Sequence, residues 1–518
     1  MLIVKYVVTK IPQDAKNKQR RFQTVALTWA IIRRWDFRPG VSSPSLTSQV
    51  LFWFLPMLDL SLIRPEILSK RTSGPTPGRT YFVQTWGCQM NEEDSEQIGL
   101  ALDGIGLQRV PSLLEADVVV LNTCSVRKKP EDKAFSLLGE LVPLKRARPG
   151  LVIAVCGCMA QIRADEIKRR APHVDIVLGT GQITRIADLV QEVARSRVFQ
   201  KELSLPERKG AVVTEIPKRD ISRKPKLKAF VPIQYGCDKF CTFCIVPTTR
   251  GRERSRPTED IVDEVTALAA NGTREVTLLG QTVNSYGKNL AEGRVPFSTL
   301  LWKLSKVEGL KRIRYTSPYP RDFKEDLVET IRDCPAVMEH VHLPLQSGNN
   351  EVLAAMKRLY TRESFLDIVA LLRSLAPGIA ITTDVIVGFP GETEEQFDDT
   401  LTLVRQIRFD GAFTFVYSPR PGTPAAEMDQ LPLAIRQQRL LKLAELQTEI
   451  TCEINAAAVG RTLEVLVEGP SPKDGGKLQG YSRDFKMVHF PGPPGLAGEI
   501  VHVEATQGHL WGLSARLL

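Results

Sequence analysis

The sequence predicts an α/β protein of three parts: an N-terminal Rossmann-like parallel α/β domain, a central partial (β/α)6 barrel and a small C-terminal β-barrel. The first two parts are predicted by two stretches, 81–197 and 229–457, in each of which short apolar runs alternate with helical patterns. A third observation predicts the β-barrel: after Gly460, short strands are separated by Gly/Pro turns. The length of 518 residues agrees with several domains.

Residues 1–78 show no clean periodicity and carry most of the net charge. They contain 12 Lys/Arg and 4 Asp/Glu, which gives +8 of the formal +10 of the whole chain. The overall charge is therefore weak support for nucleic-acid binding. We expect a disordered extension or sequence upstream of a true start at Met57, with an organellar transit peptide as the alternative.

No apolar run reaches the roughly 18–20 residues that span a bilayer. The most apolar stretch, residues 50–63, contains Pro56 and Asp59 and lies too far inside the chain for a secretory signal. We therefore expect a cytoplasmic protein without a membrane segment. In a reducing compartment its nine cysteines are expected to be metal ligands or core thiols rather than disulfides.

The N-terminal domain is expected over residues 79–199. Its apolar runs predict strands over 81–85, 116–122, 151–155 and 174–179, and the stretches between them predict helices over 92–105, 127–145, 159–170 and 183–197. Residues 200–228 carry nine Lys/Arg against four Asp/Glu and are expected to form a charged linker.

The central domain is expected over residues 229–457. Six apolar runs predict strands near 229–235, 274–280, 311–317, 340–346, 379–389 and 412–418, and a long helix over 432–457 completes the domain. Six βα units are too few for an eight-fold barrel, so we expect an open partial barrel with one side left for a substrate. Residues 458–518 are expected to form the small β-barrel.

Three cysteines, Cys237, Cys241 and Cys244, follow the first strand of the central domain within eight residues. Thiolates are soft ligands that suit iron–sulfur clusters or zinc. A structural zinc site requires four ligands, and the fourth would have to come from a distant part of the chain. The loop therefore favours a [4Fe–4S] cluster that leaves one iron without a protein ligand and free to bind a small molecule.

A second set of cysteines, Cys88, Cys124 and Cys158, comes just after three predicted parallel strands. The carboxyl ends of parallel strands share one edge of a sheet, so these thiols are expected to converge there. They indicate another cluster, with ordinary buried cysteines as the alternative. Cys156 competes with Cys158 for the third position, because both face the same side of an extended strand.

Motifs in these domains resemble the radical S-adenosylmethionine (SAM) methylthiotransferase family, and in particular its MiaB-type, tRNA-modifying branch. The resemblance covers residues 80–518, and the pattern "GCMAQ" selects Cys158 over Cys156. In it the central domain resembles a radical SAM barrel and the C-terminal module a TRAM domain. The motifs are "TWGCQMNEEDSE" (85–96), "LNTCSVRKK" (121–129), "GCMAQ" (157–161), "GCDKFCTFCIVPTTRGRERSRP" (236–257), "HLPLQSG" (342–348) and "DVIVGFPGETEEQF" (384–397).

The resemblance implies two [4Fe–4S] clusters, with SAM bound at the open iron of the second. It implies that SAM yields a radical that removes hydrogen from C2 of N6-isopentenyl-adenosine at position 37 of tRNA, giving the 2-methylthio derivative. The implied partners are tRNA and a reduced flavodoxin or ferredoxin, and a monomer is expected. The implied ligands are Cys88, Cys124 and Cys158 for the first cluster, and Cys237, Cys241 and Cys244 for the second.

Three residues of the central domain, Gly280, Gln346 and Gly388, stand at the carboxyl ends of predicted strands, where barrels place their sites. We expect them to line the SAM pocket, with tight strand-to-helix turns as the alternative for the glycines. Arg358 is expected to contact SAM or a phosphate, or else to be a solvated charge at a helix end.

Four alternating arginines, Arg250, Arg252, Arg254 and Arg256, follow the three-cysteine loop. We expect them at the cavity mouth, where they would grip tRNA phosphates, with local ion pairing to Glu253 as the alternative.

The C-terminal segment 461–518 is not basic, because its six Lys/Arg are matched by six Asp/Glu. Any RNA contact there has to use shape, Trp511 or polar groups. Cys334 and Cys452 fall in helical patterns and are expected to be packing residues.

Other functions remain open from the sequence. One alternative is a sister methylthiotransferase that acts on threonylcarbamoyl-adenosine in tRNA or on an aspartate of a ribosomal protein. An alternative of another class is a non-enzymatic iron–sulfur protein that binds RNA or transfers electrons, which would contain clusters but would not cleave SAM.

Overall fold

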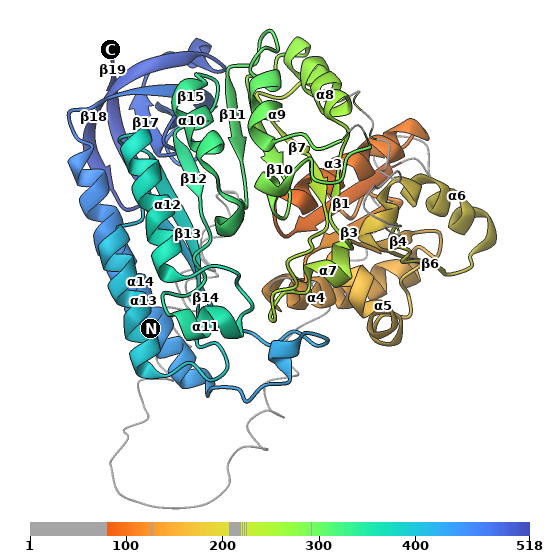
Figure 1. The fold of residues 1–518 in the computed structure, drawn as a ribbon. Coiled ribbons are helices and arrows are strands. Elements are labelled where there is room, and N and C mark those ends of the chain that lie inside the picture. Colours follow the sequence, from red (N-terminus) through yellow and green to blue (C-terminus); the bar gives the residue numbers. More distant parts are fainter. Residues whose placement is uncertain are drawn as a thin grey trace, which may run out of the picture. The chain divides into compact units, whose positions relative to one another are not determined.

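In this computed structural model residues 80–125, 128–206, 219, 221, 223, 225–291 and 293–518 are described, and all belong to one compact unit, Pro75–Leu518 (Figure 1). The expected extension of residues 1–78, with Met57, lies outside the described residues, as does much of the expected linker.

The N-terminal domain is a six-stranded parallel sheet in the order β2-β1-β3-β4-β5-β6. Its strands are β1 (Thr80–Trp86), β2 (Gln108–Arg109), β3 (Val118–Thr123), β4 (Val152–Cys156), β5 (Ile176–Leu178) and β6 (Gln200–Glu202). Its helices are α3 (Gln89–Gly104), α4 (Lys128–Ala147), α5 (Cys158–Arg170), the 3-10 helix η4 (Thr180–Arg185) and α6 (Ile186–Ser196).

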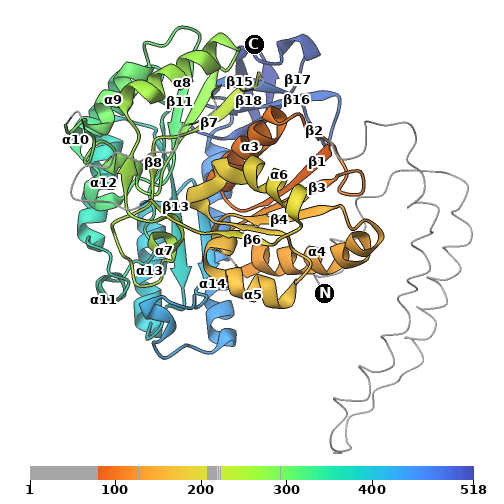
Figure 2. The same ribbon diagram turned by 90° about the vertical axis from the view of Figure 1, so that its right-hand side faces the viewer.

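The sheet is covered by helices on both faces, with α3 and α6 on one side and α4 and α5 on the other (Figure 2). Val119 and Leu121 of β3 pack into the core beneath α4 and α5, whereas Val118 and Val120 pack into the core beneath α3 and α6. Burial on both faces is the reason that this strand is a continuous apolar run rather than an alternating one.

The edge strand β6 was not expected from the sequence, which placed Gln200–Glu202 in the linker. These residues pair in parallel with β5, from Ile176↔Gln200 to Leu178↔Glu202. An edge strand is buried only in part, so its polar composition carries no apolar pattern that would predict it.

The central domain is an open barrel of six parallel strands. These are β7 (Lys228–Pro232), β10 (Glu275–Leu279), β11 (Arg312–Tyr315), β12 (His340–His342), β13 (Ala380–Val387) and β14 (Gly411–Val416). They form two three-stranded sheets that are joined by a parallel bridge between Ile313 and Val337. Within the described residues β7 and β14 do not pair with each other, which confirms the expected partial barrel.

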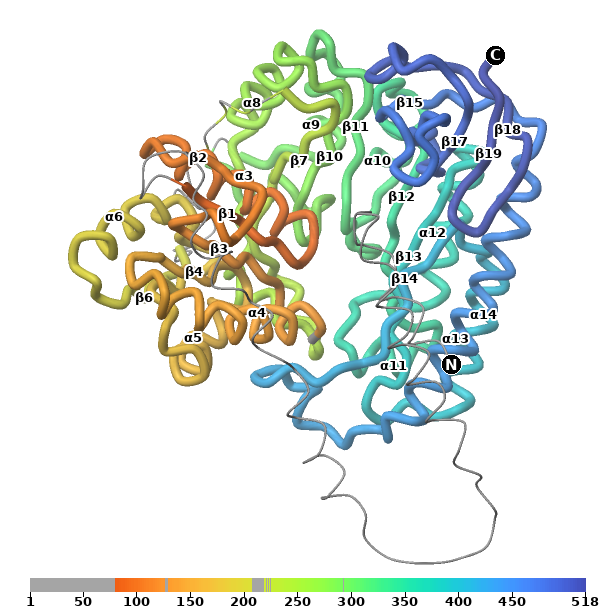
Figure 3. The backbone as a smooth tube through the Cα atoms, turned by 180° about the vertical axis from the view of Figure 1, so that it is seen from behind, coloured from red at the N-terminus to blue at the C-terminus, as the bar shows by residue number. Residues whose placement is uncertain are grey.

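Helices cover the outside of this barrel (Figures 1 and 3). They are α8 (Thr258–Ala270), α9 (Phe297–Leu304), α10 (Glu325–Asp333), α12 (Arg362–Leu375), α13 (Glu394–Ile407) and α14 (Leu433–Ala457). Two short helices, α7 (Val246–Arg250) and α11 (Asn350–Ala355), also belong to the domain, and α7 contacts α5 and η4 of the N-terminal domain. The domain also contains the antiparallel pair β8 (Gln234–Tyr235) and β9 (Arg254–Ser255), and the 3-10 helices η5 (Val283–Ser285), η6 (Pro320–Asp322) and η7 (Pro424–Ala426).

The C-terminal domain is a closed barrel in the order β15-β16-β17-β19-β18, as the sequence predicts. Its elements are β15 (Thr462–Pro470), β16 (Lys477–Ser482), β17 (Met487–Pro491), η8 (Pro494–Leu496), β18 (Ile500–His509) and β19 (Gly512–Leu517). Valine, leucine and phenylalanine side chains from alternate strand positions, such as Val465, Val467 and Phe490, fill its interior.

Arginines of β11 attach this small barrel to the central domain. Arg312 is fully buried and donates to the carbonyl oxygen of Tyr481 at 2.7 Å and to the Glu464 carboxylate at 2.8 Å. Arg314 donates to the carbonyl oxygen of Ser482 at 2.7 Å. Charge-assisted hydrogen bonds of this kind fix the C-terminal barrel against the strands of the central domain.

Among the helices of the described residues, none combines the length and the apolar character that crossing a membrane demands.

Candidate functional site

Cys88, Cys124 and Cys158, the first thiol trio, meet at one edge of the N-terminal sheet. Cys88 is the N-cap residue of α3, Cys124 directly follows β3, and Cys158 is the first residue of α5. The three strands that precede them are neighbours and parallel, and Trp86 pairs with Thr123 just before the first two thiols. Cys124 lies within hydrogen-bonding range of both other thiols, as the predicted convergence requires, and their role as cluster ligands stays a prediction.

A buried amide network holds the α3 end of this site. The side chain of Asn91, in the first turn of α3, donates to the Asn122 side chain at 3.2 Å. Asn122, in β3, donates in return to the carbonyl oxygen of Asn91 at 2.8 Å and to the Ser95 hydroxyl at 2.9 Å. Because these groups are buried and mutually satisfied, they fix the helix that carries Cys88 against the strand that precedes Cys124.

The environment of the first thiol trio favours thiolates. Hydrogen bonding with Cys124, together with the positive charge of Arg250, outweighs burial and lowers the pKa of the Cys88 thiol to about 5 and that of Cys158 to about 7. The same hydrogen bonds raise the pKa of Cys124. A thiolate is the form that binds a metal, so the donor set fits a cluster held at three corners.

Cys156 is separated from this trio by its place in the strand. It lies fully buried inside β4, in the core that the sheet forms with α3 and α6. Cys158, two residues later, has left the strand and reaches Cys124. The geometry therefore favours Cys158 as the third member, as the family motif does.

Cys237, Cys241 and Cys244, the second thiol trio, lie in the loop after β8. The backbone N–H of Cys237 donates to the carbonyl oxygen of Gly251 at 3.2 Å. The preceding Gly236 has φ +72°, and a Cβ atom there would lie 2.2 Å from the carbonyl oxygen of Arg252. Only glycine allows this close approach, which brings the loop onto the segment after α7.

The three thiols of the second trio lie within electrostatic range of one another. Burial, together with the nearby Cys241 thiol, raises the pKa of Cys237 to about 11 and that of Cys244 to about 12. Three mutually close thiols are the donor set that a [4Fe–4S] cluster with one open iron requires.

Arg358 lies beside this trio rather than in solvent. Its Nη1 donates to Sγ of Cys241 at 3.3 Å. Its guanidinium lies over the rings of Tyr319 and Tyr360, 4.7 and 5.0 Å from their centroids. The expectation of a solvated helix-end charge is therefore wrong, because stacking and the thiol hold this cation inside the site.

Of the expected SAM-pocket residues, Gln346 has the conformation of a functional residue. Its φ of +68° is unusual for a residue with a side chain, and its backbone links Asp384 and Ile386 through hydrogen bonds of 2.8 and 2.9 Å. Its Oε1 is buried and has no hydrogen-bond partner within the described residues. A polar ligand at this position would satisfy that oxygen.

At the other two expected pocket residues, Gly280 and Gly388, close packing within the protein explains why the residue is glycine. A Cβ atom at Gly280 would lie 2.9 Å from the side-chain oxygen of Gln234, and one at Gly388 would lie 2.3 Å from Cγ of Arg436. Their role in a SAM pocket stays a prediction.

Three of the four arginines after the second trio are buried, so the expectation that they grip RNA phosphates at a cavity mouth is wrong for Arg250, Arg254 and Arg256. Arg250 pairs with Asp94 of α3, and Arg256 with Glu264 of α8, each at 2.7 Å. A buried guanidinium requires such carboxylate partners, and these come from other elements of the fold.

Arg252 differs from its three neighbours because about half of its side chain is exposed. It pairs with Asp238 at 2.6 Å. Glu253, the local partner considered from the sequence, instead accepts a hydrogen bond from the Thr282 hydroxyl at 3.2 Å.

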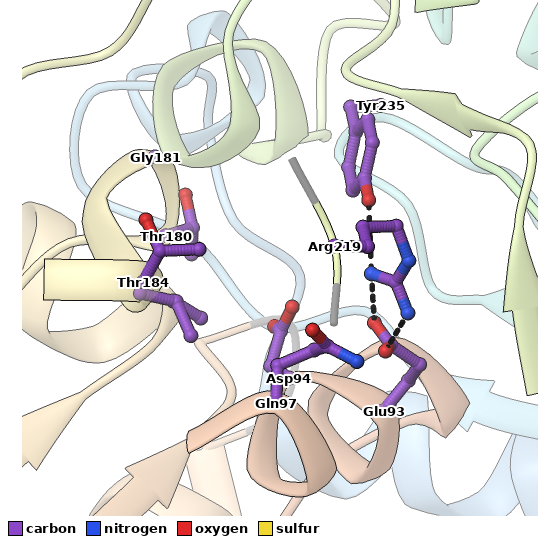
Figure 4. A pocket seen from close by; sticks show the side chains of 9 residues that line it. Glu93, Asp94, Gln97, Thr180, Gly181, Thr184, Arg219 and Tyr235 are labelled. Carbon is purple, nitrogen blue, oxygen red and sulfur yellow. Dashed lines mark hydrogen bonds and ion pairs between the residues drawn. The ribbon is translucent and has the colours of Figure 1, made fainter. Parts of the chain in front are cut away.

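A small pocket lies between α3, η4 and Arg219 (Figure 4). Glu93 pairs there with Arg219, whose Nη1 also donates to the Tyr235 hydroxyl at 3.1 Å, and Thr180 and Thr184 lie on the other side. None of the six cysteines of the two trios lines this pocket, so it is distinct from the candidate cluster sites.

The ion pairs of this pocket continue into a buried network that joins the N-terminal domain to the central domain. Glu264 of α8 is fully buried and pairs with Arg256 at 2.7 Å, with Arg219 at 3.3 Å and with Arg223. Arg223 lies 3.4 Å from Glu93 of α3. Glu93 of the N-terminal domain and Glu264 of the central domain thus pair with the same two arginines, Arg219 and Arg223.

The two remaining cysteines differ from each other. Cys334 is buried in the core of the central domain, which confirms it as a packing residue. Cys452 is exposed on α14, so the same expectation is wrong for it. The helix buries Ile450, and a residue two positions further along points to the opposite side.

Family models match all three domains. Residues 231–404 match the radical SAM superfamily, residues 80–179 match a family described as "Uncharacterized protein family UPF0004", and residues 456–518 match the TRAM domain.

Two curated relatives match most of the chain. Both are named tRNA-2-methylthio-N(6)-dimethylallyladenosine synthase; one is from Moorella thermoacetica and one from Geobacillus kaustophilus. They are 49% and 45% identical over 443 and 463 residues, which cover 85% and 89% of this chain and 98% and 86% of the relatives. The chain belongs to the tRNA-2-methylthio-N(6)-dimethylallyladenosine synthase family.

A solved structure agrees with the fold of this synthase family member. The radical S-adenosylmethionine methyltransferase TsrM from Kitasatospora setae, with cobalamin and a [4Fe–4S] cluster bound, has a TM-score of 0.50 at 16% identity. The match covers 67% of this chain and 74% of that chain, and it concerns the fold alone. The radical SAM match itself implies a [4Fe–4S] cluster and SAM as cofactors of the synthase.

Two site residues of this synthase were missed from the sequence. Asp94 carries the ion pair to Arg250, and the signal for it was the acidic run just after Cys88 on a helix with a buried face. Arg420 is buried and lies within electrostatic range of Cys124 and Glu131. Residue spacing around Arg420 could not predict this placement, because Cys124 and Glu131 come from a different domain.

Proposed function

We propose that this protein is a radical SAM enzyme that adds a methylthio group to C2 of N6-isopentenyl-adenosine at position 37 of tRNA. The observation that carries the proposal is the meeting of three thiols at the edge of the N-terminal sheet, next to a chain segment that also holds the three-cysteine SAM-type loop. A radical SAM enzyme with one cluster needs only the loop, so the additional trio favours sulfur transfer.

Each trio fits one [4Fe–4S] cluster, because each brings three thiols together and leaves the fourth iron for another ligand. When bound, the clusters and SAM supply the radical, the sulfur and the methyl group of the reaction. Two clusters per chain are thus part of the proposal.

The residues around the second trio have separate tasks in this proposal. Cys237, Cys241 and Cys244 bind the cluster, and Arg358 keeps positive charge at Cys241 through its 3.3 Å contact. Gln346 offers to SAM its Oε1, which has no hydrogen-bond partner among the described residues. The burial of these groups excludes water and strengthens their electrostatic contacts.

Each of the three domains has its own binding role in this proposal. We propose that residues 79–199 bind the first cluster, residues 229–457 bind SAM and the target base, and residues 458–518 help to bind tRNA. Gly280 and Gly388 would line the SAM pocket through their backbones. A reduced flavodoxin or ferredoxin would supply electrons to a monomeric enzyme that works in the cytoplasm, where its tRNA substrate is available.

Trp511 is the residue of the C-terminal domain best placed to stack on a base of the RNA. It lies in the turn between β18 and β19, and 85% of its side chain is exposed. Trp511→Ala is expected to weaken tRNA binding by about 1–3 kcal/mol, or roughly 5- to 150-fold, because that is the contribution of one base stacked on an aromatic ring. Titration of labelled tRNA measures this loss.

Trp302, a partly exposed tryptophan on α9 of the central domain, provides the matched control. Trp302→Ala is expected to leave the tRNA affinity unchanged. Equal affinities for the parent and Trp511→Ala would exclude stacking by Trp511.

The proposed function is tested by nucleoside analysis of tRNA from a deletion strain. Mass spectrometry is expected to find isopentenyl-adenosine without its 2-methylthio group, and the plasmid-borne gene is expected to restore it. A strain that keeps the methylthio group on isopentenyl-adenosine but loses it from threonylcarbamoyl-adenosine would identify the sister activity instead.

A second assay separates the enzyme from a non-enzymatic iron–sulfur protein. The reduced, reconstituted protein is mixed with SAM and tRNA, and 5′-deoxyadenosine is measured by chromatography. Formation of 5′-deoxyadenosine is expected, and Cys237→Ala is expected to abolish it. A wild-type protein that holds clusters but forms none would contradict the proposal.

A further inference from the structure

Arg250 follows the second thiol trio in the chain and contacts the N-terminal domain, which carries the first trio. It is the last residue of α7 and follows Cys244 by six positions, five of which form that short helix. A helix rises about 1.5 Å per residue, so α7 keeps Arg250 within about 10 Å of the second trio along its axis. A side chain at position 250 that extends toward the first trio would therefore link the two thiol trios.

The side chain of Arg250 turns toward the N-terminal domain. Its Nη2 donates to Oδ2 of Asp94 at 2.7 Å, and both side chains are buried. Asp94 lies on α3, the helix that begins just after Cys88. The guanidinium also lies within electrostatic range of the Cys88 and Cys158 thiols.

The backbone beside Arg250 holds the second trio. The carbonyl oxygen of Gly251 accepts the hydrogen bond from the N–H of Cys237 at 3.2 Å. The carbonyl oxygen of Thr249, on the other side, accepts a hydrogen bond from the Thr180 hydroxyl of the N-terminal domain. The three consecutive residues from Thr249 to Gly251 therefore contact both the N-terminal domain and the second trio.

We propose that Arg250 is a positioning residue shared by the two cluster sites: anchored on Asp94, it fixes the SAM-type loop against the first thiol trio and places a buried positive charge at the first cluster. The inference deepens the proposed function and rests on it, because it assumes a cluster at Cys88, Cys124 and Cys158.

The charge has a predictable effect on the first cluster. One-electron reduction adds one negative charge, and a nearby buried cation stabilises the reduced form more than the oxidised form. Arg250 thus raises the reduction potential of the first cluster, whereas Asp94 lowers it. A residue that served only to pack the domains together would not produce opposite effects for the two partners of one ion pair.

The experiment uses the full-length chain in which Cys237, Cys241 and Cys244 are all replaced by Ala, so that only the first cluster is assembled. After anaerobic reconstitution, the midpoint potential is measured by redox titration followed by electron paramagnetic resonance, together with iron content. Arg250→Met is expected to shift the potential to more negative values, Arg250→Lys to keep most of the parent value, and Asp94→Asn to shift it to more positive values.

Arg252→Met is the matched control, because Arg252 lies two residues away but is half exposed and pairs with Asp238. Its potential is expected to equal that of the parent. Shifts of the same sign in Arg250→Met and Asp94→Asn, or no shift in either, would overturn the proposal. If Arg250→Met fails to bind iron, Arg250→Lys and Asp94→Asn decide the question, because each keeps a cation at this position.

Failure of this inference is distinguishable from failure of the proposed function. A parent protein that binds no iron at the first trio would contradict both. A parent that binds iron normally and shows unchanged potentials in the variants would contradict the role of Arg250 alone.

Discussion

Cys158→Ala is expected to abolish methylthiolation of tRNA and to halve the iron content of the reconstituted protein, from about eight to about four atoms per chain. The variant keeps only Cys88 and Cys124 of the first trio, and two thiolates do not hold a [4Fe–4S] cluster that needs three protein ligands. The second trio lies in a separate loop and is left intact, so cleavage of SAM to 5′-deoxyadenosine is expected to remain detectable. Iron analysis, chromatography and nucleoside mass spectrometry measure the three quantities.

Cys156→Ala is the control for this variant. Cys156 is also fully buried, two residues earlier, but it packs in the core between β4 and the helices α3 and α6. The substitution removes one sulfur atom from a hydrophobic environment and is expected to leave iron content and product formation near those of the parent. Loss of iron in Cys156→Ala with retention in Cys158→Ala would reverse the assignment of the third ligand.

The first trio could be predicted because its geometry follows from local patterns. The apolar runs that end before Cys88 and Cys124 identify strands, and parallel strands place their carboxyl ends at one edge. The distance along the chain then becomes irrelevant, and thiols that are more than thirty positions apart meet. Periodicity could not choose between Cys156 and Cys158, because that choice depends on where β4 ends and α5 begins.

The burial of the arginines could not be predicted, because their partners are set by tertiary contacts. An alternating basic stretch at the end of a loop is usually solvated, and nothing in the neighbourhood of Arg250 indicates Asp94, which lies 156 positions away. The same holds for the edge strand β6 and for the exposed Cys452, since exposure at an edge or on one side of a helix depends on what packs there. Local pattern thus predicted the elements and the thiols, while the charged contacts between domains required the fold.

Glu264→Ala is expected to destabilise the protein by about 3–5 kcal/mol, because it leaves buried guanidinium groups without their shared carboxylate. Glu264 is fully buried and pairs with Arg256, Arg219 and Arg223. Among the residues that the structure describes, Arg219 and Arg223 keep Glu93 as an acidic partner when Glu264 is removed, whereas Arg256 keeps none. Thermal and urea unfolding followed by circular dichroism measure the loss. Limited proteolysis is also expected to cut the variant faster between the N-terminal and central domains, because the network that joins them is broken.

Glu259→Ala separates this effect from the loss of any carboxylate on α8. Glu259 lies on the same helix, is mostly exposed and pairs with Lys303 at 2.8 Å. Exposed pairs contribute at most about 1 kcal/mol, so this variant is expected to unfold close to the parent. Glu264→Gln keeps the size and hydrogen-bonding capacity of the side chain without its charge, and is expected to fall between the two. If Glu264→Ala unfolds at the same urea concentration as Glu259→Ala, the buried network does not hold the domains together, and the three arginines must find water or other acceptors when the carboxylate is removed.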